Sequence, residues 1–123
     1  MSFPLNQPTV TIAINTSLSG ATYIGDGDLV GIMMPAGWTS AGITFQSSYD
    51  GVTYQNLWDA AGNEITVSSS SAVASQNITI DSDQFDGCVW IKFRSGTGAS
   101  PVNQAAARTI TLLVRKRPQY ITR

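Results

Sequence analysis

Two β-prone segments joined by Asp50-Gly51 constrain the fold more than any other part of the sequence. An Asp-Gly pair between such segments is the strongest short-range signal for a β-hairpin. A two-residue loop would place Tyr49 opposite Val52, and a longer loop would shift the register, turn Trp58 to the opposite face and bring Leu57 inward. With the short loop, one face of the ribbon collects Ile43, Phe45, Tyr49, Tyr54 and Trp58.

A hairpin of this kind needs a second layer to cover its apolar face. Other alternating or apolar runs are separated by turn-forming residues, and no window has a sustained helical period. We expect these further strands at 9–15, 28–34, 64–68, 76–80, 88–95 and 108–115. The sequence therefore predicts an all-β fold, an antiparallel two-layer β-sandwich of about eight strands, with jelly-roll and immunoglobulin-like topologies both open.

The chain divides into three parts. Residues 1–8 contain two prolines and no periodicity, which predicts an extended N-terminal arm. Residues 9–115 form the predicted sandwich domain, and residues 116–123 form a basic C-terminal tail. Residues 1–8 have neither a basic segment nor an apolar one, so we expect no signal peptide and no membrane span.

Within the strands, the alternation places Val10, Ile12 and Ile14 on one face. The segment 88–95 turns Val89, Ile91 and Phe93 inward, and Trp90, Lys92 and Arg94 outward.

Residues 81–87 read as a single helical turn, capped by a side chain and anchored in the core by Phe85. They resemble a calcium loop only superficially, because Phe85, Asp86 and Lys92 occupy positions that require other residues in an EF-hand. A looser calcium loop is the alternative to a plain capped turn, and we predict no cofactor.

The sequence offers no recognisable catalytic constellation. It contains no histidine and a single cysteine, Cys88, which lies among apolar residues and is expected to be a buried filler. The acidic residues lie mainly in turns, where aspartate is favoured for its geometry alone. We therefore predict that the protein is not an enzyme.

Charge is distributed unevenly along the chain. All eight acidic residues precede residue 87 and all seven basic residues follow residue 91, for a net charge of −1. A basic carboxyl end suits docking on an acidic surface, including a second copy of the chain, although charged strand ends that discourage edge aggregation explain it equally well. The cluster Arg115-Lys116-Arg117 is too short to predict nucleic-acid binding.

Several aromatic residues are candidates for a sugar-binding platform. Most are expected to fill the core, because aromatic side chains supply much of the buried area in small β domains. Trp90 is the candidate we retain, since it lies opposite Val89 and Ile91 on its strand. The full set is Trp38, Tyr49, Tyr54, Trp58, Trp90 and Tyr120.

Four segments resemble small proteins encoded among the virion genes of tailed bacteriophages. They are PAGWT (35–39), ITFQSSYDGVTY (43–54), IKFRSG (91–96) and PVNQAAAR (101–108), within a similarity that covers roughly residues 26–117. The motif Ser-x-Asp-Gly-x-x-aromatic also occurs in discoidin-like carbohydrate-binding jelly rolls, where Tyr54 replaces the usual tryptophan. The resemblance implies a structural role on the particle, with head decoration first and a tail or collar position second.

These expectations define a set of partners. The protein would be made in the host cytoplasm, reside in the virion, and bind the major capsid protein, other virion proteins or copies of itself. A carbohydrate-binding adhesion module that recognises a host surface glycan is the alternative function. The residues predicted to contact partners lie in the two ends of the chain: Phe3, Leu5, Arg115, Lys116, Arg117, Tyr120 and Arg123.

Overall fold

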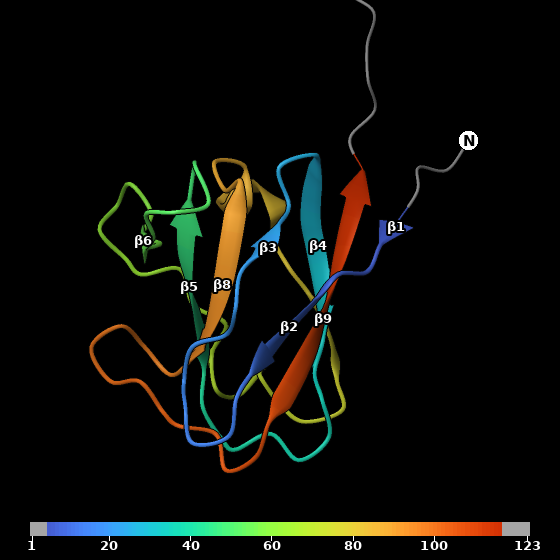
Figure 1. Ribbon diagram of the computed structural model, residues 1–123, viewed down its shortest axis with the longest axis vertical. Coiled ribbons are helices and arrows are strands. Elements are labelled where there is room, and N and C mark those ends of the chain that lie inside the picture. The colour runs from blue at the N-terminus through green and yellow to red at the C-terminus, as the bar shows by residue number, and fades with distance from the viewer. Residues whose placement is uncertain (1–4, 117–123) are drawn as a thin grey trace, which may run out of the picture.

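The computed structural model describes residues 5–116, which form nine strands and one short helix (Figure 1). The elements are β1 (Leu5–Asn6), β2 (Thr9–Ile12), β3 (Thr22–Tyr23), β4 (Gly27–Met33), β5 (Ile43–Ser48), β6 (Gln55–Asn56), β7 (Asn77–Thr79), the 3₁₀ helix η1 (Ser82–Phe85), β8 (Trp90–Ser95) and β9 (Arg108–Lys116). Within these residues, no helix has the length and apolar character needed to cross a membrane.

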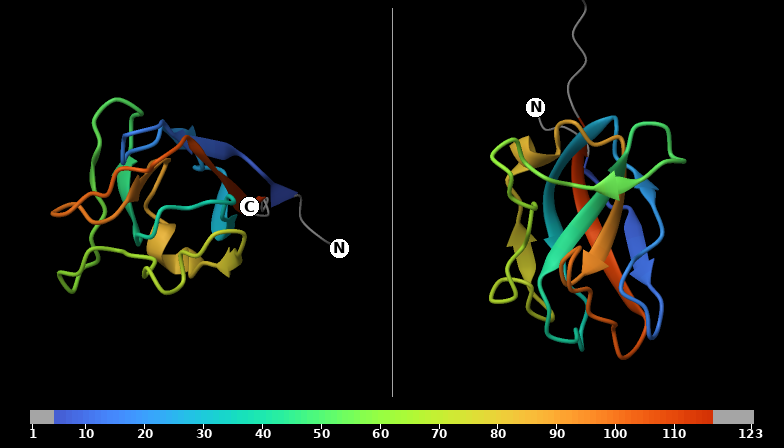
Figure 2. Two further views of the ribbon diagram at one scale, coloured as in Figure 1. Left: turned by 90° about the horizontal axis from the view of Figure 1, so that it is seen from below. Right: turned by 90° about the vertical axis from the view of Figure 1, so that its left-hand side faces the viewer.

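The strands form two antiparallel sheets that pack face to face (Figure 2). One sheet has the order β1-β9-β4-β7, with β2 also paired to β9, and the other has the order β3-β8-β5-β6. This confirms the predicted all-β, antiparallel two-layer sandwich. The strand order is that of a jelly roll, which settles the choice between the two topologies that the sequence left open.

The topology follows from one long antiparallel ribbon. Successive pairs along the ribbon are β2 with β9, β3 with β8, β4 with β7, and β5 with β6. The ribbon then rolls up so that β4 pairs with β9 and β5 pairs with β8. The loop 49–54, which joins β5 to β6, is the tip of this ribbon.

The core lies between the two sheets and is built from alternating inward residues of both. Phe45 on β5 is fully buried, and its ring meets the rings of Phe85 and Phe93 edge-on, with centroids 4.9 Å apart in each case. Edge-on contacts of this kind add to the stabilisation from burial alone. The largest buried apolar side chains are Ile12, Leu29, Ile32, Ile43, Phe45, Ile91, Phe93, Ile110 and Leu112.

The predicted hairpin is confirmed, and it closes with the longer of the two loops that the sequence left open. Gln46 pairs with Asn56 and Ser47 with Gln55, which differs by one residue from the register of a two-residue loop. Leu57 therefore packs against the core, whereas Trp58 is 55% exposed, as expected for the longer loop. Of the aromatic face predicted for the hairpin, only Ile43 and Phe45 belong to the core, while Tyr49 and Trp58 are exposed and Tyr54 is half-buried.

Other strand boundaries also differ from the prediction. Strand β2 ends at Ile12, and Ile14 is exposed because the chain turns between Ala13 and Thr16, with Asn15 at a positive φ of 61°. The segment 64–68 makes only isolated bridges, between Trp58 and Glu64 and between Ile43 and Val67. The short strand β3 was not predicted.

The turn at 81–87 is confirmed. Asp81 caps η1 by accepting a hydrogen bond from the backbone N–H of Asp83, and Phe85 is buried in the core. Ile91 and Phe93 point inward as expected. Residues 5 and 6 of the predicted arm pair with β9 of the same chain, and Lys116, assigned to the tail, is the last residue of β9.

The aromatic cluster provides a stability test. Phe45→Ala removes a ring that contacts two others, so we expect it to lower the free energy of unfolding by about 3–5 kcal/mol. Val52→Ala, at a position 81% exposed, should change it by less than about 0.5 kcal/mol. Urea unfolding monitored by fluorescence measures both variants, and equal effects would contradict the assignment of Phe45 to the core.

Candidate functional site

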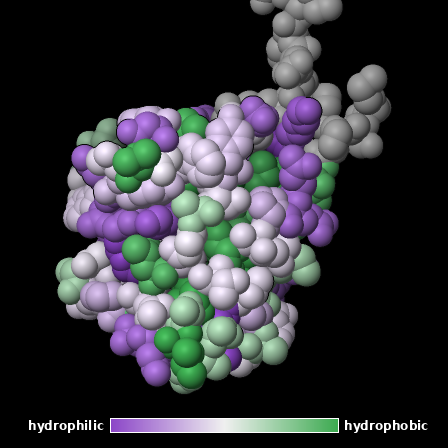
Figure 3. All heavy atoms as spheres, in the orientation of Figure 1, coloured by the Kyte–Doolittle hydropathy of each residue, from purple (hydrophilic) through white to green (hydrophobic). Residues whose placement is uncertain are grey.

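Both ends of the described chain meet at one corner of the first sheet. Leu5 pairs with Arg115, and Asn6 with Val114, so β1 lies beside the end of β9 (Figure 1). Leu5 is 42% exposed, and Arg115 and Lys116 are also exposed. We call Leu5, Asn6, Arg115 and Lys116 the terminal corner. Hydrophilic side chains gather on this side of the molecule (Figure 3).

The terminal corner unites three of the seven residues predicted to contact partners. Leu5 lies more than a hundred positions before Arg115 and Lys116 in the sequence, yet the three residues are neighbours on two paired strands. The other four predicted residues, Phe3, Arg117, Tyr120 and Arg123, lie outside the described residues.

A shallow groove of about 270 Å³ lies next to the terminal corner. The Tyr23 hydroxyl donates a hydrogen bond of 3.2 Å to a carboxylate oxygen of Asp26 at this groove. The negative charge of Asp26 raises the pKa of Tyr23 above its ordinary value of 10.0. The groove is lined by Asn6, Pro8, Tyr23, Ile24, Asp26, Gly27 and Val114.

Trp90, the predicted sugar platform, is half-buried and partly covered by neighbours. Tyr23 contacts it edge-on, with ring centroids 5.2 Å apart. Gly51 lies against it so closely that a Cβ there would be 3.0 Å from two indole atoms. Gly51 also has a φ of +77°, so both its conformation and its contact with Trp90 favour glycine.

The remaining aromatic candidates differ in how far they are open to solvent. Trp38 is buried and donates its indole N–H to the carbonyl of Ala41, and Tyr54 packs under the ammonium of Lys92, which lies 4.3 Å from the ring centroid. In contrast, Tyr49 is 82% exposed and Trp58 is 55% exposed. Tyr120 lies outside the described residues.

Asp50 holds the ribbon tip in one conformation. One of its carboxylate oxygens accepts hydrogen bonds from the N–H groups of Val52 and Thr53, at 2.8 and 2.9 Å, and from the Ser48 hydroxyl at 2.8 Å. The Ser48 hydroxyl oxygen in turn accepts from the N–H of Gly51 at 2.9 Å. The bonds from Thr53, Val52 and Ser48 lower the pKa of Asp50 to about 2.

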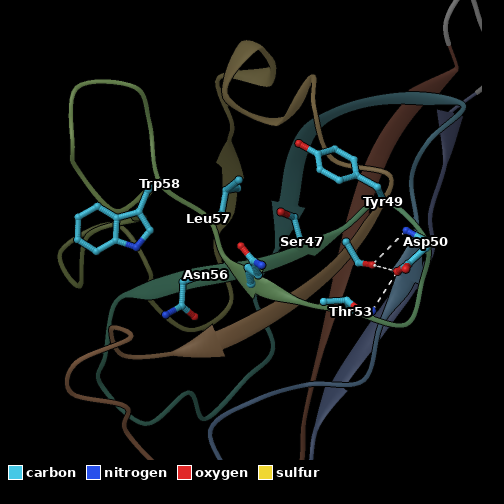
Figure 4. Close-up of a pocket in the computed structure, with 9 residues that line it drawn as sticks. Ser47, Tyr49, Asp50, Thr53, Asn56, Leu57 and Trp58 are labelled. Atoms are coloured by element: carbon cyan, nitrogen blue, oxygen red, sulfur yellow. Dashed lines mark hydrogen bonds between the residues drawn. The ribbon is translucent and has the colours of Figure 1, made fainter.

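A groove of about 390 Å³ runs along β6, at the edge of the second sheet (Figure 4). We call it the β6 groove. Tyr49 stands at one end of it and Trp58 at the other, with Leu57 and Ser47 between them. Its lining consists of Ser47, Ser48, Tyr49, Asp50, Thr53, Gln55, Asn56, Leu57 and Trp58.

A buried polar cluster fixes the wall of the β6 groove at Asn56. The Arg94 guanidinium donates to the Asn56 side-chain carbonyl at 2.5 Å and forms an ion pair of 3.4 Å with Glu64. Glu64 also accepts two hydrogen bonds from the N–H of Gly98, at 3.1 and 3.2 Å. Arg94 was predicted to face outward, yet it is only 6% exposed, because the loops that contain Glu64 and Gly98 cover it.

The sequence alone did not reveal the β6 groove. Its position depends on the register between β5 and β6, which turns Trp58 outward, and on the loop 49–54, which turns Tyr49 outward. The one usable signal is that each of these rings directly precedes an aspartate that favours a turn, in Tyr49-Asp50 and Trp58-Asp59.

Cys88 is buried, as predicted from its apolar neighbours. Burial raises the pKa of the thiol to about 11, which keeps it protonated and weakly reactive. Among residues 5–116, no group of three or more cysteine, aspartate or glutamate side chains is placed to hold a metal ion.

Comparison of the chain with models of protein families, with curated proteins and with solved structures found no match.

The Asp50 carboxylate makes the ribbon tip sensitive to acid. Because its pKa lies below the ordinary 3.8, the ionised form stabilises the fold above that value, and this stabilisation is lost as the pH falls towards about 2. In Asp50→Asn, the side chain cannot titrate. We therefore expect the variant to be less stable than the wild type near pH ~5 and the difference to shrink near pH ~2. Urea unfolding at both values measures it, and a difference independent of pH would refute the assignment.

Proposed function

We propose that this protein is a structural component of a bacteriophage virion, a capsid decoration protein bound in many copies through its two ends. The observation that carries the proposal is the pairing of Leu5 with Arg115, which brings both ends of the described chain to one corner. A subunit whose two ends leave from one place can be anchored there by both of them, so the second contact gains from the first.

The charge of the terminal corner supports this mode of attachment. Arg115 and Lys116 are exposed at the end of β9, beside the exposed apolar side chain of Leu5. Cations beside an apolar residue suit a partner surface that is acidic and partly apolar, because charge complementarity steers association and apolar contact adds affinity. The partner in this proposal is the major capsid protein or another copy of the chain.

The fold is compatible with the proposal by analogy. Jelly rolls are found in viral capsid proteins and also in lectins, so the fold itself does not select one function. The resemblance of segments 35–39, 43–54, 91–96 and 101–108 to tailed-phage virion proteins favours the particle. A tail or collar position would use the same terminal corner and differ only in the partner.

Charge reversal at the terminal corner tests the proposal. Lys116→Glu places a negative charge on the contact surface, so we expect about tenfold weaker incorporation into particles at limiting protein. Lys92→Glu is the matched control, with the same charge change on β8, and should be incorporated like the wild type. Quantitative mass spectrometry of gradient-purified particles from cells infected by the phage that encodes the chain measures both variants.

Deletion of residues 1–4 and 117–123 completes the test, because it removes Phe3, Arg117, Tyr120 and Arg123 together. We expect the deletion variant to fold but to be absent from particles. Full incorporation of this variant, or absence of the wild-type chain from purified particles, would contradict the proposal.

A further inference from the structure

The β6 groove has an exposed aromatic ring at each end, and each ring is carried by backbone that hydrogen bonds hold in place. Tyr49 is 82% exposed and Trp58 is 55% exposed, although aromatic side chains normally contribute most when they are covered. Tyr49 precedes the turn that Asp50 holds together. Trp58 precedes a second turn, in which one Asp59 carboxylate oxygen accepts hydrogen bonds of 2.9 Å from the N–H groups of both Ala61 and Asn63.

The backbone on either side of Trp58 is also held by hydrogen bonds, on one side to β5 and on the other to the turn that follows. The Leu57 N–H donates to the Phe45 carbonyl at 3.0 Å, and the Asp59 N–H donates to the Asn63 carbonyl at 2.8 Å. Because the backbone is already fixed, a ligand has to order only the side-chain torsions of the two rings, which limits the entropic cost of binding.

Apart from Asp50, the polar part of the lining is uncharged and rich in both donors and acceptors. Ser47, Thr53, Gln55 and Asn56 contribute hydroxyl and amide groups between the two rings. Lysine and arginine are missing from the lining among the described residues. The only carboxylate in it, Asp50, has one oxygen committed to three hydrogen bonds within its own loop. This chemistry does not favour a phosphate or another anion.

A ligand that fits must therefore carry hydroxyl groups around its edge and apolar C–H faces that can cover a ring. Sugar rings have both features. A volume of about 390 Å³ lies within the range of small-molecule sites, roughly 300–1,000 Å³. A peptide added as a further strand fits less well, because β6 has only two residues with which to pair.

We propose that the β6 groove binds a neutral glycan, with Tyr49 and Trp58 covering sugar faces and the amide group of Gln55 binding sugar hydroxyls. Asn56 forms a fixed part of the groove wall, because Arg94 donates to its side-chain carbonyl and its amide nitrogen lies beside Gly98. This site is separate from Trp90 and from the terminal corner. It adds recognition of a surface polysaccharide to the proposed structural role and does not depend on that role.

Affinity electrophoresis of the full chain tests the proposal, with gels that contain the neutral polysaccharides dextran, mannan, galactan or glucan, or the anionic alginate. A neutral-glycan array extends the range of sugars. We expect retardation by at least one neutral polysaccharide or binding to one neutral glycan. Tyr49→Ala and Trp58→Ala should each weaken that binding by about tenfold or more. Val52→Ala, an exposed apolar residue of the same loop outside the groove lining, is the matched control and should bind like the wild type.

Each outcome of this test is decisive. Loss of binding in Tyr49→Ala and Trp58→Ala, with unchanged thermal unfolding and with binding kept in Val52→Ala, supports the site. Binding that only Trp90→Ala abolishes, retardation by alginate alone, or failure of the wild type to bind both the neutral polysaccharides in the gels and the neutral glycans on the array overturns it. None of these results alters the prediction for Lys116→Glu, so the two proposals fail independently.

Discussion

The conformation of loop 49–54, the tip of the ribbon, determines how β5 pairs with β6. This pair is one end of the long antiparallel ribbon that forms the sandwich. Asp50 and Ser48 satisfy four backbone N–H groups of loop 49–54 within the loop itself, those of Asp50, Gly51, Val52 and Thr53. This arrangement sets the pairing of Gln46 with Asn56. Because side chains alternate along a strand, a shift of one residue here would exchange Leu57 and Trp58 between core and solvent.

Two buried polar side chains, Arg94 and Gln104, hold long loops in place against the two sheets. Arg94 joins the loops of Glu64 and Gly98 over the outer face of β8. Gln104 is fully buried, and its amide donates to the carbonyl of Thr39 and to the hydroxyl of Ser95 while its carbonyl oxygen accepts from the N–H of Thr39. Every buried side-chain polar atom of the described residues has a hydrogen-bond partner, as a single well-defined fold requires.

The sequence was informative where structure depends on local pattern. Alternation predicted β8 and β9, and the residues 81–87 predicted the capped turn with Phe85 as its anchor. The sequence was uninformative where residues distant in the chain determine whether a side chain is buried. The alternation of β8 turns Arg94 outward, but only the loops of Glu64 and Gly98 bury it, and the chain gives no local sign of that contact. The sequence left the hairpin register open for a related reason, because the side-chain hydrogen bonds within loop 49–54 compete with the preference of Asp-Gly for a two-residue turn.

The sequence likewise predicted the local features of the candidate sites and not those that depend on strand pairing. The basic residues of the terminal corner were evident in the sequence, but their position beside Leu5 depends on the pairing of β1 with β9. The β6 groove depends on the hairpin register and was therefore missed. The two sites lie at opposite sides of the molecule, with β1 at one edge and β6 at the other (Figure 1). A subunit anchored at its terminal corner could thus present the β6 groove to solvent.

Cross-strand nuclear Overhauser effects between backbone protons test the ribbon register most directly, because they report pairing residue by residue. The account predicts contacts between Gln46 and Asn56 and between Ser47 and Gln55, along with contacts of Thr22 with Ile91 in the β3–β8 pair of the ribbon. Contacts between Ser47 and Tyr54 would show instead that the tip closes with a two-residue loop. That result would place Trp58 in the core and remove the β6 groove.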